Sequence, residues 1–156
     1  MIALKAIADA LAARFAPGTI ATPSNAAAMR ASYAQIPKNI AAVPCVVLEV
    51  QDGTLTANPG QWTHEIRIDV VFVYSKRQAD TVREEKQRQL WLGTLLAATE
   101  GQMKLGLGSA TGYTVDKAIP TSWEFIEYPF GGENTTYDAI RIHFTVYARE
   151  TVSLTP

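Results

Sequence analysis

The sequence has few of the residues that build catalytic centres or covalent cross-links. It contains one cysteine, Cys45, and two histidines, His64 and His143, in 156 residues. A single cysteine excludes an internal disulfide and fits a reducing compartment. No His–Cys or His–carboxylate spacing of a metal site occurs. We therefore expect no metal or other cofactor, a buried structural Cys45, a structural His64 with its hydrogen bonds satisfied, and a solvated His143.

Long hydrophobic runs and an excess of one charge are also missing. No stretch approaches the ~18 consecutive apolar residues that a membrane span needs. Lys5, Asp9 and Arg14 interrupt the N-terminal segment, so it does not match a signal peptide. The net charge of -1 gives no reason to expect a nucleic-acid-binding surface over the whole chain. We expect a cytoplasmic protein without membrane contact, folded as a single domain over residues 1–156.

The longest regular pattern is WTHEIRIDVVFVY, residues 62–74, in which apolar and polar residues alternate. A period of two is typical of a β-strand with one face on a core and the other in water. The run is about twice the usual ~5–6 residues of a strand, so it should twist strongly or extend beyond the body. Val71 and Val73 make its last part apolar on both faces, which predicts that both faces are covered there.

Two helices are expected. In residues 2–15 apolar side chains recur every three or four positions, which predicts an amphipathic helix lying flat on a sheet or on a neighbouring subunit. Thr81 and Glu84 match a capping box at the start of a second helix. That helix begins polar and ends apolar, so it should enter from solvent and bury Trp91 and Leu95 on one side.

Three further strands complete the pattern, at 45–50 and at about 113–128 and 135–149. Turn residues predict an antiparallel hairpin between the first two strands, with an extended loop at 51–61. Pro120 cannot donate a ladder hydrogen bond, so its strand should lie at an edge or contain a bulge. The α-β-β-α-β-β order favours an α+β fold. We expect a two-layer sandwich with a mainly antiparallel four-stranded sheet and the helices packed on one face.

Residues 18–43 are the least regular part of the chain. Prolines punctuate the region, and the segment SNAAAMRASYAQI has the composition of a short helix capped by Ser24 or Asn25. A loop this long in a compact domain tends to be functional or to belong to an interface. We interpret it as an arm that orders against a partner.

Candidate interface residues lie on this arm, on the hairpin at 51–61 and on the polar phase of the strands. They are Met29, Tyr33, Asp52, Leu55, Asn58, Glu65, Arg67, Asp69, Tyr137, Arg141 and Tyr147. Aromatic side chains often anchor interfaces, but core packing is the better interpretation for Trp62 and Trp123, which share the apolar phase. No acid–base pair stands out, so we identify no catalytic residue.

The order of segments along almost the whole chain resembles that of a known family. An alanine-rich helix ends at FAPGT, and an irregular arm leads to the apolar strand VPCVVLEV. After the long strand come RQADTVREEKQRQLWLGTLL, the glycine-rich link KLGLGSATGYTV and the closing hairpin YPFGGENTTYDAIRIHFTVYA. This layout resembles the small tail-terminator and tail-completion proteins of long-tailed, siphovirus-like bacteriophages. The closing segment is the most telling part, and no residue-level functional motif accompanies it.

The resemblance implies a structural virion protein that is not an enzyme. Such proteins form a ring, commonly a hexamer, that caps the tail tube, stops its polymerisation and presents a surface to the head–tail connector. The implied partners are copies of the chain, the tail tube protein and the connector or stopper protein, with genomic DNA passing through the lumen. The protein would assemble in the host cytoplasm and reside in the virion. Two alternatives stay open: a neck or connector protein, and a small α+β enzyme or ligand-binding domain with its pocket between the second helix and the sheet.

Overall fold

The computed structural model describes residues 2–24, 26–40, 42–76, 82–100, 104–109, 112–129 and 136–153. The regular elements of these residues are the helices α1 (Leu4–Ala13) and α2 (Val82–Ala97) and the strands β1 (Ala31–Tyr33), β2 (Cys45–Asn58), β3 (Gln61–Lys76), β4 (Tyr113–Pro129) and β5 (Thr136–Thr151). Neither helix is a candidate membrane span, because no helix in the described part of the chain is long and apolar enough.

One sheet contains all five strands, in the order β1-β2-β3-β5-β4. β1 is parallel to β2, and the other neighbours are antiparallel. The predicted α+β class is confirmed, but the expected four-stranded sheet is corrected to a mixed sheet of five. The extra strand lies where the sequence favoured a short helix. Its backbone pairs with residues 45–47 of β2, and this tertiary pairing overrides the weak helix propensity of the segment.

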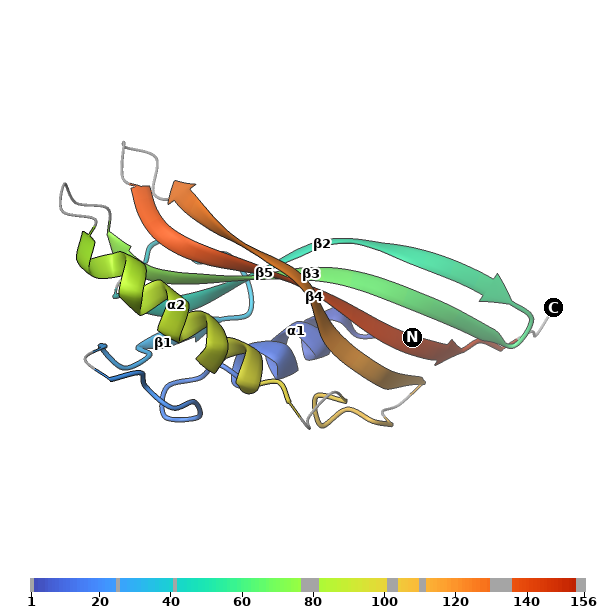
Figure 1. Cartoon of the computed structure of the whole chain (residues 1–156). Coiled ribbons are helices and arrows are strands. Elements are labelled where there is room, and N and C mark those ends of the chain that lie inside the picture. The colour runs from blue at the N-terminus through green and yellow to red at the C-terminus, as the bar shows by residue number, and fades with distance from the viewer. Residues whose placement is uncertain are drawn as a thin grey trace.

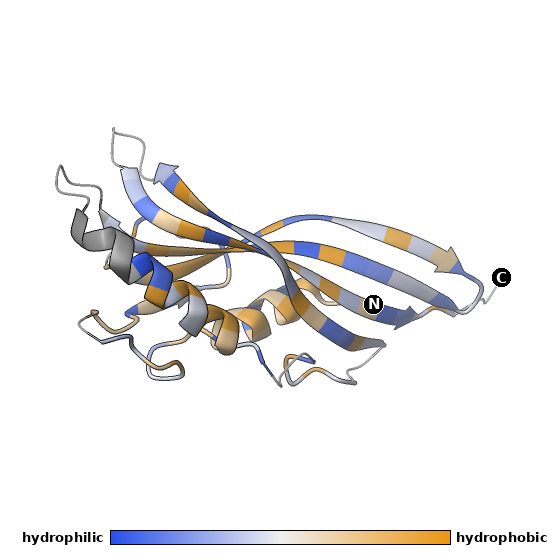
Figure 2. Cartoon of the chain, in the orientation of Figure 1, coloured by the Kyte–Doolittle hydropathy of each residue, from blue (hydrophilic) through white to orange (hydrophobic). Residues whose placement is uncertain are grey.

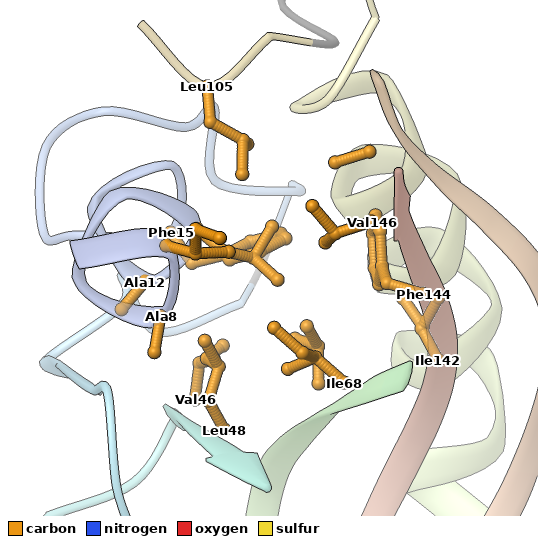
Figure 3. Packing of buried hydrophobic residues seen from close by; sticks show 14 of the residues in the cluster. Ala8, Ala12, Phe15, Val46, Leu48, Ile68, Leu105, Ile142, Phe144 and Val146 are labelled. Atoms are coloured by element: carbon orange, nitrogen blue, oxygen red, sulfur yellow. The ribbon is translucent and has the colours of Figure 1, made fainter. Parts of the chain in front are cut away.

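Both helices lie on the same face of the sheet, which we call the helix face (Figure 1). The amphipathic stripe of α1 buries Ile7 and Leu11 there, as its spacing predicted. Phe15 follows the helix and points toward the strands (Figure 3), with its ring centroid 6.5 Å from that of Phe144. Figure 2 shows hydrophobic residues along α1, at the end of α2 and on the strands behind them. The largest fully buried side chains of this core are Trp91, Phe15, Phe72, Phe144, Ile7, Leu11, Leu48, Ile68, Leu95, Ile140 and Ile142.

The end of α2 is fixed by aromatic packing. Trp91 is 1% exposed, and its ring centroid lies 4.6 Å from that of Phe72. Leu95, one turn later, is also fully buried, so the predicted inward direction of the two residues is confirmed. The predicted capping box lies outside the described residues, because Thr81 belongs to the undescribed segment.

Among the described residues, the face opposite the helices, which we call the open face, is covered at one end only. There Val71 and Val73 of β3 pack in a second cluster with Cys45, and Tyr33 and Val43 lie against it. The expectation that both faces of this strand end are covered is confirmed. The cover comes from the segment predicted to be an arm, and that segment also packs on its own domain.

Met29 and Ser32 show how closely this segment joins the body. Met29 is 5% exposed and belongs to the main core. The Ser32 hydroxyl donates a 2.6 Å hydrogen bond to the carbonyl oxygen of Ala12, at the end of α1. The backbone amide of Arg30 donates to the carbonyl of Pro44 at 2.9 Å. Part of the proposed arm is therefore integral to the fold.

β2 and β3 project beyond the helices as a long hairpin (Figure 1). The loop expected at 51–61 is corrected: β2 continues to Asn58, and only Pro59 and Gly60 form the turn. Gly60 adopts a φ of 81°, which suits glycine best. A bulge at Gln51 shifts the register between the two strands and lets pairing continue. The sequence favoured a loop because residues 52–60 are rich in turn formers.

β4 is the edge strand that Pro120 predicted, and its register shifts beside this proline. The bulge confirms the expected irregularity. Trp123 was expected in the core, but it is 48% exposed. It sits on the helix face, opposite Ile142 in the register, and its ring centroid is 5.3 Å from that of Phe125. Its place on an edge strand leaves one side of the indole uncovered.

Candidate functional site

The open face carries a group of ionisable side chains at the middle of the sheet. Alternation along the strands sends odd-numbered residues of β3 and β5 to this face, away from the core. The register aligns Glu49 with Asp69 and with His143, and places Arg141 opposite Glu124. These five residues come from four strands, and we call them the open-face cluster.

His143 lies between two carboxylates of the open-face cluster. Its Nδ1 is 2.6 Å from Oδ1 of Asp69, and its Nε2 is 3.4 Å from Oε1 of Glu124. Asp69 is 6% exposed, whereas the imidazole is 37% exposed. The sequence predicted a solvated His143. The ring does lie on the face away from the core and is partly exposed, but the prediction missed that register brings carboxylates to both of its ring nitrogens.

Arg141 supplies the positive charge at the centre of the open-face cluster. Its guanidinium nitrogens lie 3.6 Å from Asp69, 3.7 Å from Glu124 and 3.8 Å from Glu49. These separations give ion pairs without close hydrogen bonds. The buried Nε atom has no hydrogen-bond partner among the described residues. The guanidinium is thus shared by three carboxylates instead of being committed to one.

Two buried groups border the open-face cluster. The hydroxyl of Tyr128 donates a 2.7 Å hydrogen bond to Glu49. Burial, together with this bond to a carboxylate, raises the pKa of Tyr128 well above its usual range. Burial also raises the pKa of the Cys45 thiol to about 11. Cys45 is therefore a neutral thiol at physiological pH and not a nucleophile, as its apolar setting in the sequence predicted.

A second ion pair lies further along the open face, at the base of the hairpin. Two guanidinium nitrogens of Arg67 donate hydrogen bonds to the Asp52 carboxylate, and the Nη2–Oδ2 distance is 2.6 Å. The hydrogen bond from Arg67 lowers the pKa of Asp52. A shallow pocket of about 290 Å³ lies between this pair and His143, with Asp69 and Thr121 also in its wall.

The structure brings most predicted interface residues onto one surface. Six of them share the open face: Asp52, Glu65, Arg67, Asp69, Arg141 and Tyr147. Leu55 and Asn58 lie exposed near the hairpin tip. The other three pack against the body: Met29 in the main core, and Tyr33 and Tyr137 against the second cluster. A role in partner contacts stays a prediction for all eleven.

Sequence reasoning missed Glu49, Glu124 and the pairing of both histidines. His64, expected as a structural residue, is partly buried, with its Nε2 2.9 Å from Oε2 of Glu150. This hydrogen bond lowers the pKa of Glu150. Alternation along the strand could have placed Glu49 on the open face, because it lies an even number of residues from Cys45. Finding its partners required the register, which depends on the bulge at Gln51.

The open-face cluster holds acidic and basic side chains beside one another through ion pairs. Among the described residues, no group of three or more His, Cys, Asp and Glu side chains is arranged to hold a metal ion. The pocket expected between the second helix and the sheet is occupied, where the structure describes it, by Trp91 against Phe72. A hollow of about 590 Å³ lies instead beside α1. No known family model matches the sequence, and a search of curated proteins finds no significant similarity.

Proposed function

We propose that the chain is a structural virion protein that caps a phage tail tube as a ring, commonly of six copies. The ring ends tube polymerisation, offers a docking surface to the head connector and lets the genome pass through its lumen. The layout of the sequence suggests this assignment, and the shape of the domain supports it. A neck or connector protein of the same virion region is the alternative.

The projecting hairpin is the observation that carries the proposal. Residues 51–59 are exposed, so both faces of this part of β2 meet solvent. β3 pairs with β2 on one side and with β5 on the other from its first residue onward. Residues 51–59 of this stiff extension add nothing to the core of their own domain. It is well placed to reach a neighbouring molecule.

The outer edge of the hairpin supports the same conclusion. β1 pairs only with residues 45–47 of β2, so the edge of β2 beyond them has no neighbouring strand among the described residues. Long exposed edges invite pairing with other chains, and proteins usually block them with charges or proline. From Gln51 to Asn58 the only charged side chain is Asp52, and no proline occurs. An edge left this open fits a chain that is covered by partners after assembly.

Deletion of the gene from the encoding phage distinguishes a tail terminator from a neck or connector protein. A terminator occupies the tube end, so its loss should give tubes longer than the normal tail under the electron microscope. Loss of a connector should give tails of normal length beside separate heads. Complementation with the full chain serves as the control and should restore uniform tails. Normal-length tails after deletion would refute the terminator assignment.

A further inference from the structure

The sheet has three free edges, and they differ in how well they resist pairing with another chain. β1 and β4 are the outermost strands, and β2 has a free edge where it extends beyond β1. β1 has only three residues, and β4 contains two prolines and two register shifts. Short strands, prolines and bulges are the usual means of blocking an edge. Among the described residues, only the β2 segment after the bulge at Gln51 offers a long edge without any of them.

This segment, residues 52–58, is regular as well as exposed. It pairs with β3 without interruption, from Asp52 opposite Arg67 to Asn58 opposite Gln61. β5 holds the other side of β3 along the same length, so the backbone is kept extended in the projecting hairpin (Figure 1). All seven residues are exposed. In an antiparallel ladder alternate residues direct their backbone N–H and C=O groups away from the paired strand, and a further β-strand satisfies such a row of groups.

The sequence of the segment, DGTLTAN, fits antiparallel pairing with a second copy of itself. A two-fold axis at Leu55 sets this residue opposite Leu55 of the second copy, on the same face of the joined sheet. Leu55 is 49% exposed, so the pairing covers apolar surface. The other opposite pairs are Thr54 with Thr56, Gly53 with Ala57 and Asp52 with Asn58. Threonine pairs of this kind form hydrogen bonds that stabilise neighbouring strands.

Charge and length both favour this register. Asp52 is the only charged residue of the segment, and it faces an asparagine, so no like charges are opposed. Its carboxylate already accepts a 2.6 Å hydrogen bond from Nη2 of Arg67 in its own chain. Moving the axis by one residue shortens the paired segment, because it runs into the bulge at Gln51 or the turn after Asn58. The segment is thus its own complement, which identifies a second copy of the chain as the occupant.

From these observations we infer that two copies of this chain pair antiparallel through residues 52–58 of β2, joining two five-stranded sheets into one. The inference goes beyond the proposed function and does not depend on it. The contact is two-fold, whereas a cyclic ring is closed by head-to-tail contacts, so the pair belongs to the protein before assembly. It covers the unprotected edge of each copy. A strand pair of this length is smaller than a standard interface, so the association is weak and reversible.

Sedimentation of the full chain over a concentration series tests the pairing. The wild type should show a monomer–dimer equilibrium. Leu55→Asp removes the apolar pair at the axis and opposes two carboxylates there, which should weaken dimerisation about 10-fold. Leu90→Asp adds the same charge at an equally exposed leucine of α2 and should dimerise like the wild type.

Three outcomes of this measurement would overturn the inference. A wild type that stays monomeric up to about 1 mM would exclude a second copy as the occupant. Growth beyond the dimer would show head-to-tail pairing in place of the two-fold contact. Equal weakening by both variants would show that the dimer uses another surface. The capping role would stand in each case, because the tail lengths of the deletion phage test it separately.

Disulfide formation under mild oxidation tests the register. Leu55→Cys should form a covalent dimer faster than Leu90→Cys, because opposite positions bring the two thiols together. Cys45 is fully buried, so the wild type should form none. An equal mixture of Thr54→Cys and Thr56→Cys should form mixed dimers faster than either variant forms dimers alone. A dimer that Leu55→Cys does not link would overturn the β2 contact, and no preference for the mixed pair would overturn the antiparallel register.

Discussion

His143 and Asp69 are held 2.6 Å apart between Nδ1 and Oδ1, across the paired strands β5 and β3. The ionised carboxylate has no proton to give, so the ring nitrogen must be the donor. Asp69 is 6% exposed, and Arg141 approaches its other oxygen at 3.6 Å. The carboxylate therefore links two basic side chains of β5 to the middle of the sheet.

Asp69→Asn should measurably destabilise the domain. The substitution keeps the shape of the side chain but removes the charge that holds His143 and Arg141. Hydrogen bonds to charged groups are worth about 1.5–3 kcal/mol, and we expect a loss of this size in the free energy of unfolding. Denaturant titration at neutral pH measures it. Asp52→Asn, at the exposed hairpin pair, is the control and should have much less effect; equal effects would contradict the structural role of Asp69.

Trp91→Ala and Leu90→Ala should differ sharply although the residues are neighbours on α2. Trp91 is 1% exposed and packs on Phe72, whereas Leu90 is 52% exposed. Truncating a buried tryptophan costs about 3–5 kcal/mol, while exposed changes stay within about 0.5 kcal/mol. Thermal or denaturant unfolding of the two variants tests this difference. A loss below about 1 kcal/mol for Trp91→Ala would show that α2 is not anchored by this side chain.

Much of this architecture could be predicted from periodicity alone. Alternation in 62–74 identified the central strand, and helical spacing gave the buried faces of both helices. Pro120 marked the irregular edge strand, because its missing amide proton acts locally. In each case the deciding interaction lies within one element, so a single stretch of sequence contains the signal.

Features that depend on pairing between distant segments could not be predicted. β1 exists because β2 offers its edge to residues 31–33, and nothing in ASY itself requires a strand. The open-face cluster needs the register of four strands, which the bulge at Gln51 sets for β2. Trp123 has the phase of a core residue, but its exposure depends on how far the helices extend across the sheet.

Stability should decline in acid as carboxylates lose their partners. Hydrogen bonds from His64, Arg149 and Arg67 lower the pKa values of Glu150, Asp116 and Asp52 respectively. As the pH falls, the unfolded chain takes up these protons first, so the free energy of unfolding decreases until the folded carboxyls are protonated too. The stabilisation is present above the ordinary carboxyl pKa of about 4 and is lost below it.

Glu150→Gln makes this prediction specific. The variant should be less stable than the wild type at pH 6, and the two should converge as the pH falls through the lowered pKa of Glu150 in the folded protein, where the wild-type carboxyl loses its charge. Glu100→Gln, on an exposed residue after α2, controls for the loss of a negative charge and should follow the wild type at every pH. Denaturation midpoints of the wild type and both variants, measured at a series of pH values, test this prediction. A constant difference between Glu150→Gln and wild type would show that the His64 contact contributes no pH dependence.

The hairpin yields the last prediction. Leu55 is 49% exposed near the tip and contributes little to the core of its own domain, so Leu55→Asp should fold with nearly unchanged stability. If the hairpin contacts the tube end, a buried unpaired carboxylate at that contact is costly, and phage carrying this variant should make overlong tails. Leu90→Asp introduces the same charge at an equally exposed leucine of α2 and should leave tail length normal. Electron microscopy of both variants gives the tail lengths, and unfolding curves confirm that both proteins fold. Normal tails with folded Leu55→Asp would exclude the hairpin tip as the stopping contact, because a charge at the centre of that contact could not be accommodated without weakening the cap.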